Sequence, residues 1–146
     1  MVPGKYIWMD GKLVLWENAT THVMLTHSLH YGSAVFEGIR FYEDPKGRVI
    51  FRNEDHVNRI FYSSTWMEMQ VSFTKEQIAN AVIEVIQNSE LKEGYVRPIF
   101  YIYNKVGVSP LGGEVRIAIG CWSWGGKYLS DDAVRIKTSK WRRIPQ

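Results

Sequence analysis

The sequence has a single cysteine, Cys121, so no internal disulfide can form. It has no run of about 18 apolar residues, so we expect no membrane-spanning helix. The first residues lead directly into a strand-like segment, with no secretory signal ahead of it. These absences predict a cytoplasmic protein in which Cys121 is a small buried side chain.

Motifs of several enzyme classes are also missing. The sequence has no glycine-rich dinucleotide or Walker loop and no serine nucleophile elbow. Its four histidines show no metal-ligand spacing with Cys121 or with carboxylate pairs, so we expect no metal site. The net charge of +3 comes from scattered residues and gives little support to binding of nucleic acid or a membrane surface.

The composition is that of one folded domain followed by a polar tail. Of the 146 residues, 45% are apolar, which is enough for a hydrophobic core. Aromatic residues make up 14%, and some of these rings are expected to face a ligand or a partner. After Trp124 the chain becomes polar and basic, with one short strand pattern at 133–137. We expect a folded domain over 1–124 and a linker over 125–137.

Local patterns predict an α+β fold, an antiparallel sheet with two main helices. Asp10-Gly11 is typical of a hairpin turn, and Gly32 is expected to end a short helical turn that begins at Thr26. Asn53 is predicted to cap a helix that runs to about Met67. Thr74 and Gln77 form a capping box for a second helix, with an apolar stripe of Ile78, Val82, Val85 and Ile86. The predicted strands cover 6–9, 12–16, 35–42, 48–52, 95–103 and 115–122.

The strand at 95–103 carries the clearest sign of a binding site. Alternation along a strand places one set of side chains on a core face and the other on an aromatic face with one cation. The guanidinium of Arg97, with a tyrosine phenol beside it, could hold a carboxylate. The same spacing is also typical of a solvated sheet face with a salt bridge, and Pro98 suggests an edge strand or a bulge. The set with the cation comprises Tyr95, Arg97, Ile99, Tyr101 and Tyr103, and the core set comprises Val96, Pro98, Phe100 and Ile102.

The strand at 35–42 repeats this theme. Phe36, Gly38 and Arg40 share one face, and Gly38 would let a flat ligand approach the backbone closely. A bulge glycine beside a core phenylalanine is the simpler alternative. On the following helix, Arg59 lies three residues after His56 and could bind a phosphate group, although such a residue is often only a solvated surface arginine.

Several sequence blocks resemble those of the branched-chain amino acid aminotransferases and occur in the same order as in that family. These proteins are fold-type-IV pyridoxal-phosphate enzymes. The similarity extends over roughly residues 6–145 and is specific because so many blocks coincide. It rests on the Trp8/Asp10-Gly11 hairpin, His30-Tyr31-Gly32, Val35-Phe36-Glu37-Gly38-Ile39-Arg40, Phe51-Arg52, His56-x-x-Arg59, Tyr95-Val96-Arg97-Pro98, the Gly107 loop, Trp124-Gly125 and Trp141-Arg142-Arg143.

The resemblance implies a transaminase that uses pyridoxal phosphate and exchanges leucine, isoleucine or valine with 2-oxoglutarate. Arg59 resembles the arginine that binds the cofactor phosphate, and Tyr95 and Arg97 resemble groups near the substrate carboxylates. The loop at 106–108 resembles one that reaches into a neighbouring subunit's site, which implies a homodimer. The implied substrate-site residues are Phe36, Tyr31, Tyr95, Arg97, Trp124, Tyr128, Val106, Gly107, Val108, Gly38 and Arg40.

The resemblance also implies that a catalytic lysine lies beyond Gln146. In the family this lysine follows the Trp-Arg-Arg block, and neither Lys137 nor Lys140 matches its position. We therefore expect the chain to be the small domain plus linker, with 138–146 as the start of a large cofactor domain. Alone, such a chain is expected to be inactive.

Other functions stay open from the sequence. A D-amino-acid transaminase or an aminodeoxychorismate lyase would share the fold. A non-catalytic domain that associates with itself would use exposed apolar surface. A single-stranded nucleic-acid binder would use the tyrosine-rich strand face and the basic tail.

Overall fold

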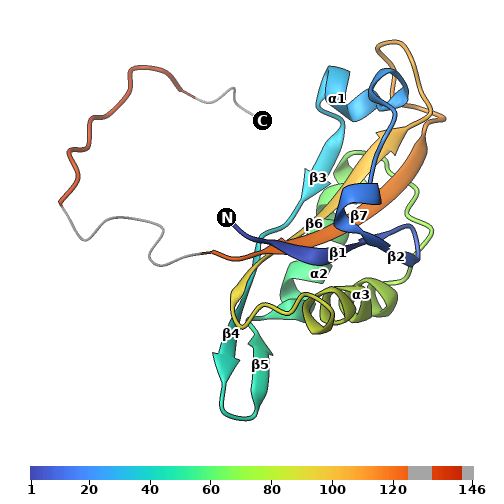
Figure 1. The fold of residues 1–146 in the computed structure, drawn as a ribbon. Helices are drawn as coiled ribbons and strands as arrows, with labels where there is room; N and C mark the ends of the chain where they lie inside the picture. The colour runs from blue at the N-terminus through green and yellow to red at the C-terminus, as the bar shows by residue number, and fades with distance from the viewer. Residues whose placement is uncertain (125–132, 143–146) are drawn as a thin grey trace.

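The computed structural model describes residues 1–124 and 133–142 and shows an antiparallel sheet with helices against one face (Figure 1). This is the α+β fold that the sequence predicts. The strands are β1 (Pro3–Met9), β2 (Lys12–Leu15), β3 (Ala34–Phe36), β4 (Ile39–Asp44), β5 (Gly47–Ile50), β6 (Gly94–Tyr103) and β7 (Glu114–Trp122). The helices are α1 (His27–Tyr31), α2 (Asn53–Trp66) and α3 (Lys75–Gln87), with short 3-10 turns η1 (Trp16–Asn18) and η2 (Val23–Leu25).

The strands follow the order β2-β1-β7-β6-β4-β5, and β3 pairs with β6 beside β4. All of the pairings are antiparallel. The β6–β7 pair forms the centre, with nine paired positions from Tyr95↔Trp122 to Tyr103↔Glu114. β6 is therefore an inner strand with continuous register through Pro98, and the prediction of an edge strand or a bulge there is wrong.

The core lies between the sheet and the two longer helices. α2 and α3 pack on each other and cover the same face of the sheet (Figure 1). All four residues of the predicted apolar stripe of α3 are buried. Burial of this much apolar surface is the main source of stability of the domain. The core side chains include Ile39, Phe41, Val57, Ile60, Ile78, Val82, Val85, Val96, Phe100, Ile117 and Ile119.

Several local predictions are confirmed. Asp10 and Gly11 both have positive φ, as a two-residue turn between twisted strands requires. Gly32 takes the left-handed conformation that ends α1. The Thr74 and Gln77 capping box is present at the start of α3.

The predicted strand at 35–42 is interrupted at Glu37 and Gly38. The register continues across the interruption, because Phe36 pairs with Ile99 and Ile39 with Val96. Opposite Glu37 lies Pro98, whose carbonyl accepts the Glu37 N–H at 3.0 Å. Proline has no N–H to return a hydrogen bond. The break therefore comes from a residue on the neighbouring strand, and the two faces keep the predicted alternation.

Two further predictions are wrong. Asn53 is not the N-cap of α2, since Arg52 holds that position in the left-handed conformation and Asn53 donates to the Ala79 carbonyl of α3 at 3.1 Å. This bond turns the Asn53 side chain toward α3, so that its oxygen does not accept from the backbone at the start of α2. No strand forms at 133–137, because these residues are exposed and no strand among the described residues lies beside them to complete their hydrogen bonds.

Candidate active site

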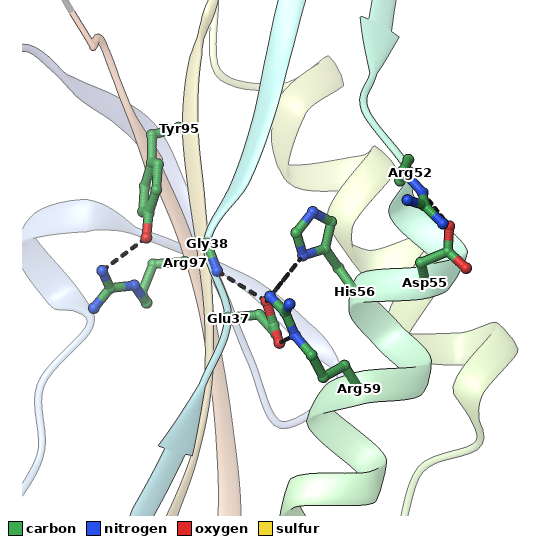
Figure 2. A network of polar contacts seen from close by, with 8 residues as sticks. All are labelled: Glu37, Gly38, Arg52, Asp55, His56, Arg59, Tyr95 and Arg97. Carbon is green, nitrogen blue, oxygen red and sulfur yellow. Dashed lines mark hydrogen bonds and ion pairs between the residues drawn. The ribbon is translucent and has the colours of Figure 1, made fainter. Parts of the chain in front are cut away.

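Two groups of side chains lie on opposite faces of the sheet, on either side of the segment from Phe36 to Arg40. Figure 2 shows Tyr95 and Arg97 on one side of the strands, and Glu37 with two residues of α2 on the other. The alternation of side chains along a strand produces this division. We call the second group the Arg59 cluster, which comprises Glu37, His56 and Arg59. We call the first group the aromatic face, which comprises Tyr95, Arg97, Phe36, Trp122 and Trp124.

The aromatic face is built around Arg97. Its Nη2 donates to the Tyr95 hydroxyl at 2.8 Å, and its guanidinium carbon lies 4.2 Å from the centre of the Phe36 ring. The Tyr95 ring packs against those of Trp122 and Trp124, at centroid distances of 5.1 and 4.9 Å. The structure thus brings together four of the residues predicted for the substrate site: Tyr95, Arg97, Phe36 and Trp124.

Gly38 is required here for a reason that the sequence does not reveal. A Cβ atom at this position would overlap the phenol of Tyr95. Glycine therefore makes room for a side chain of the protein itself, where a flat ligand was predicted to approach. Arg40, the other predicted residue of this segment, pairs with Tyr95 across the strands and places its guanidinium 5.3 Å from the ring of Tyr42.

Three buried N–H donors near the aromatic face have no hydrogen-bond partner within the described residues. They are Nε of Arg40, Nε of Arg97 and the indole Nε1 of Trp122. Buried donors are normally satisfied, so this arrangement fits an acceptor that comes from outside the described chain. A carboxylate is the acceptor that suits guanidinium donors best. Trp122 was not predicted, because its register with Tyr95 is visible only in the folded sheet.

The Arg59 cluster is centred on the Glu37 carboxylate, which is only 5% exposed. Arg59 donates to it from Nε, and from Nη2 at 2.5 Å, and His56 donates from Nδ1 at 2.9 Å (Figure 2). Burial raises the pKa of Glu37, but the hydrogen bonds from Arg59 and His56 outweigh it, so the pKa is lowered overall. Hydrogen bonding to Glu37 raises the pKa of Arg59 in turn.

The Arg59 cluster borders a cavity of about 320 Å³. The Arg59 side chain is 64% exposed, and its Nη1 has no partner among the described residues. A second arginine, Arg52, lines the same cavity and pairs with Asp55 at 2.6 Å. Two guanidinium groups and an imidazole form a donor set that suits a phosphate ester.

Tyr31, the last residue of α1, and the loop at 106–108, part of the connection between β6 and β7, lie at one end of the sheet (Figure 1). Their side chains are exposed, with Val106 at 73% and Val108 at 81%. His27 joins the two segments, because its Nε2 donates to the Gly107 carbonyl at 2.8 Å and its ring packs on Tyr31. This role of His27 was not predicted. Tyr128 lies outside the described residues.

The described residues contain no group of His, Cys, Asp and Glu side chains that could bind a metal ion. Across 1–124 and 133–142, no helix has the length and hydropathy of a membrane span.

Comparisons with known proteins identify relatives of this chain. A branched-chain-amino-acid aminotransferase from Pseudomonas aeruginosa is 41% identical over 142 residues, which cover 94% of this chain and 46% of that protein. A crystal structure from Thermoproteus uzoniensis, a branched-chain aminotransferase with norvaline, superposes with a TM-score of 0.87 at 34% identity, over 97% of this chain and 48% of that one.

A third relative was solved with a bound ligand. This branched-chain amino acid aminotransferase, from the organism abbreviated T.th., is complexed with N-(5'-phosphopyridoxyl)-L-glutamate. It superposes with a TM-score of 0.81 at 37% identity, over 85% of this chain and 42% of that one. The chain spans about half the length of the curated relatives it matches. The pattern of the family described as amino-transferase class IV matches residues 34–146. The chain therefore belongs to the class IV aminotransferase family.

Proposed function

We propose that this chain supplies the substrate-recognition side of a branched-chain amino acid transaminase, in a protein of the length of its relatives. The reaction exchanges the amino group of leucine, isoleucine or valine with 2-oxoglutarate. The observation that carries the proposal is the Arg97 guanidinium, which lies against Phe36 and Tyr95 with a buried, unpaired Nε.

One site must accept both an aliphatic side chain and the carboxylate of glutamate. The aromatic rings bind the aliphatic side chain by burial. Glutamate brings a second carboxylate, which is costly to desolvate unless a cation meets it. Arg97 meets this requirement because its fork of donors can bind a carboxylate in a bidentate manner.

The cofactor of this reaction would be pyridoxal phosphate, which supplies an electron sink for charge that develops at the substrate's α carbon. The Arg59 cluster fits its phosphate group, because Nη1 of Arg59 has no hydrogen-bond partner among the described residues and Arg59 lines a cavity together with a second arginine. Arg59 would hold the phosphate, and Arg52 would add positive charge to the rim of the cavity.

The remaining site residues keep the roles that the resemblance implies. Tyr31 and the loop at 106–108 would contribute to the site of a second copy in a homodimer. The domain of 1–124, the linker of 125–137 and a larger domain that begins at 138 stay predictions, as does a cytoplasmic location. The relatives quoted above are all named as branched-chain aminotransferases, which favours this substrate class over a D-amino-acid transaminase or an aminodeoxychorismate lyase.

The test is Arg97→Ala in a protein of the relatives' length that contains this chain. We expect kcat/KM for 2-oxoglutarate to fall by about 30-fold or more, since a desolvated carboxylate loses its cation. The value for leucine should fall several-fold less. Arg116→Ala is the matched control, because Arg116 also lies over a tyrosine ring on the same sheet, 4.7 Å from the centre of Tyr103. Equal losses for both substrates in Arg97→Ala would contradict the proposal.

A further inference from the structure

Glu37 holds Arg59 in one particular orientation. Its two carboxylate oxygens accept from Nε and Nη2, the two donors along one side of the guanidinium. Since the guanidinium is planar and rigid, the opposite side, with both hydrogens of Nη1, is directed away from Glu37. That is the side without a partner within the described part of the chain.

Glu37 is itself held in place. His56 donates to it from Nδ1 at 2.9 Å and the Gly38 N–H donates at 3.3 Å, so three groups converge on one buried carboxylate. Its backbone N–H is bonded to the Pro98 carbonyl in the sheet. A long, exposed arginine is thereby attached to a rigid part of the fold.

We propose that Glu37 is a positioning residue that presets Arg59 for a phosphate monoester, with His56 as its support. This inference rests on the proposed function, in which Arg59 binds the cofactor phosphate. A free arginine side chain must lose its rotational freedom when it binds an anion. In this fold, contact with Glu37 removes that freedom before the anion arrives.

Charge alone predicts the opposite effect. Glu37 carries a negative charge beside Arg59, and removing that charge should strengthen the binding of any anion through simple Coulomb attraction. Positioning predicts that the same removal weakens binding. The sign of the change therefore separates the two explanations.

The experiment compares Glu37→Gln with the unsubstituted protein, in a protein of the relatives' length that contains this chain. The probes are pyridoxamine 5'-phosphate and pyridoxamine, which differ only in the phosphate group. We expect Glu37→Gln to weaken binding of the phosphorylated probe by about three- to tenfold, the effect of ordering one long side chain. Binding of pyridoxamine should change much less. The Arg59 Nε–H signal in NMR should lose the shift that its contact with Glu37 causes.

Asp55→Asn is the matched control, because Asp55 is a carboxylate beside the same cavity that pairs with Arg52 and not with Arg59. It should bind the phosphorylated probe at least as tightly as the unsubstituted protein and keep the Arg59 signal in place. If Glu37→Gln does not fold, Glu37→Asp retains the charge but withdraws the carboxylate by one methylene. It should then show the same weakening.

Unchanged or tighter binding in Glu37→Gln would overturn the proposal. These readouts require no turnover, so a protein that binds the probes as expected but does not transaminate would reject the proposed function and retain the role of Glu37. If the unsubstituted protein does not discriminate between the two probes, Arg59 binds no phosphate and both ideas fail.

Discussion

Glu37 is the residue where the two halves of the candidate site meet. Its neighbours Phe36 and Gly38 face Arg97 and Tyr95, while its own carboxylate faces Arg59 on the other side of the sheet (Figure 2). A buried carboxylate is stable only when it is paired, and here the pairs come from a helix 19 and 22 residues further along the chain.

The lowered pKa of Glu37 makes its contribution to stability depend on pH. In the unfolded chain the carboxyl group has its ordinary pKa of 4.5, and in the folded chain it binds a proton only at lower pH. Its stabilising effect is therefore complete above the ordinary pKa and is lost as the pH falls through the lowered value.

We expect Glu37→Gln to lower the free energy of unfolding by about 1–2 kcal/mol at pH 7, because it weakens the hydrogen bonds from Arg59 and His56. The loss is no larger because solvent screens the exposed part of Arg59. The difference from the unsubstituted protein should shrink below pH 4.5, as urea denaturation at several pH values would show. Glu43→Gln is the control, since Glu43 pairs with Lys92 in solvent, and it should change stability by less than about 0.5 kcal/mol. A difference that stays constant down to about pH 3 would show that the charge of Glu37 is not the cause.

At the level of elements, local patterns in the sequence predict most of the fold. Period-two alternation identifies both faces of β6, and capping residues identify the start of α3, because each depends only on residues close in sequence. The predictions are wrong where a contact with an element distant in sequence determines the local structure. Pro98 interrupts the strand opposite it, and α3 engages Asn53.

The candidate site divides in the same way. Tyr95 and Arg97 of the aromatic face could be predicted, since alternation along one strand places them on the same side, whereas Trp122 of the neighbouring strand could not. The bond between Glu37 and Arg59 could not, because only the packing of α2 on the sheet brings them together. The same holds for His27, whose partner Gly107 lies 80 residues away.

His27 connects α1 to the loop between β6 and β7, and we expect it to control how often that loop opens. His27→Phe keeps the aromatic ring against Tyr31 but removes the bond to the Gly107 carbonyl, together with the bond between Nδ1 and the Ser33 hydroxyl. Hydrogen exchange of the Lys105 amide, which donates to the Leu25 carbonyl, should become about tenfold faster. His27→Gln offers an N–H donor at a similar reach and should restore most of the protection. Unchanged exchange in His27→Phe would show that other contacts hold the loop.

At the scale of the whole molecule, exposed apolar side chains gather at the end of the sheet that carries α1. Val106 and Val108 are more than two-thirds exposed, and Tyr31 and Leu29 are at least half exposed. A group of exposed apolar side chains is typical of a surface that binds another protein chain. This arrangement supports the proposed homodimer, in which the loop would reach a second copy.

We expect Val106→Ser combined with Val108→Ser to raise the dimer dissociation constant about tenfold or more, from the loss of two buried apolar side chains. Sedimentation velocity over a range of concentrations would measure it in a protein of the relatives' length. Val49→Ser is the control, because Val49 is a half-exposed valine on β5 at the opposite end of the sheet. If all of these variants associate equally, the loop takes no part in the interface.

The continuous register between Phe36 and Ile39 also limits which changes in chain length this segment could tolerate. Removing Val35 would turn the side chains that follow it in this segment to the other face of the sheet. The Phe36 ring would then point at the helices, and the Glu37 carboxylate would point toward Arg97. Point substitutions here weaken one contact at a time, whereas a single-codon deletion would exchange the two halves of the site at once.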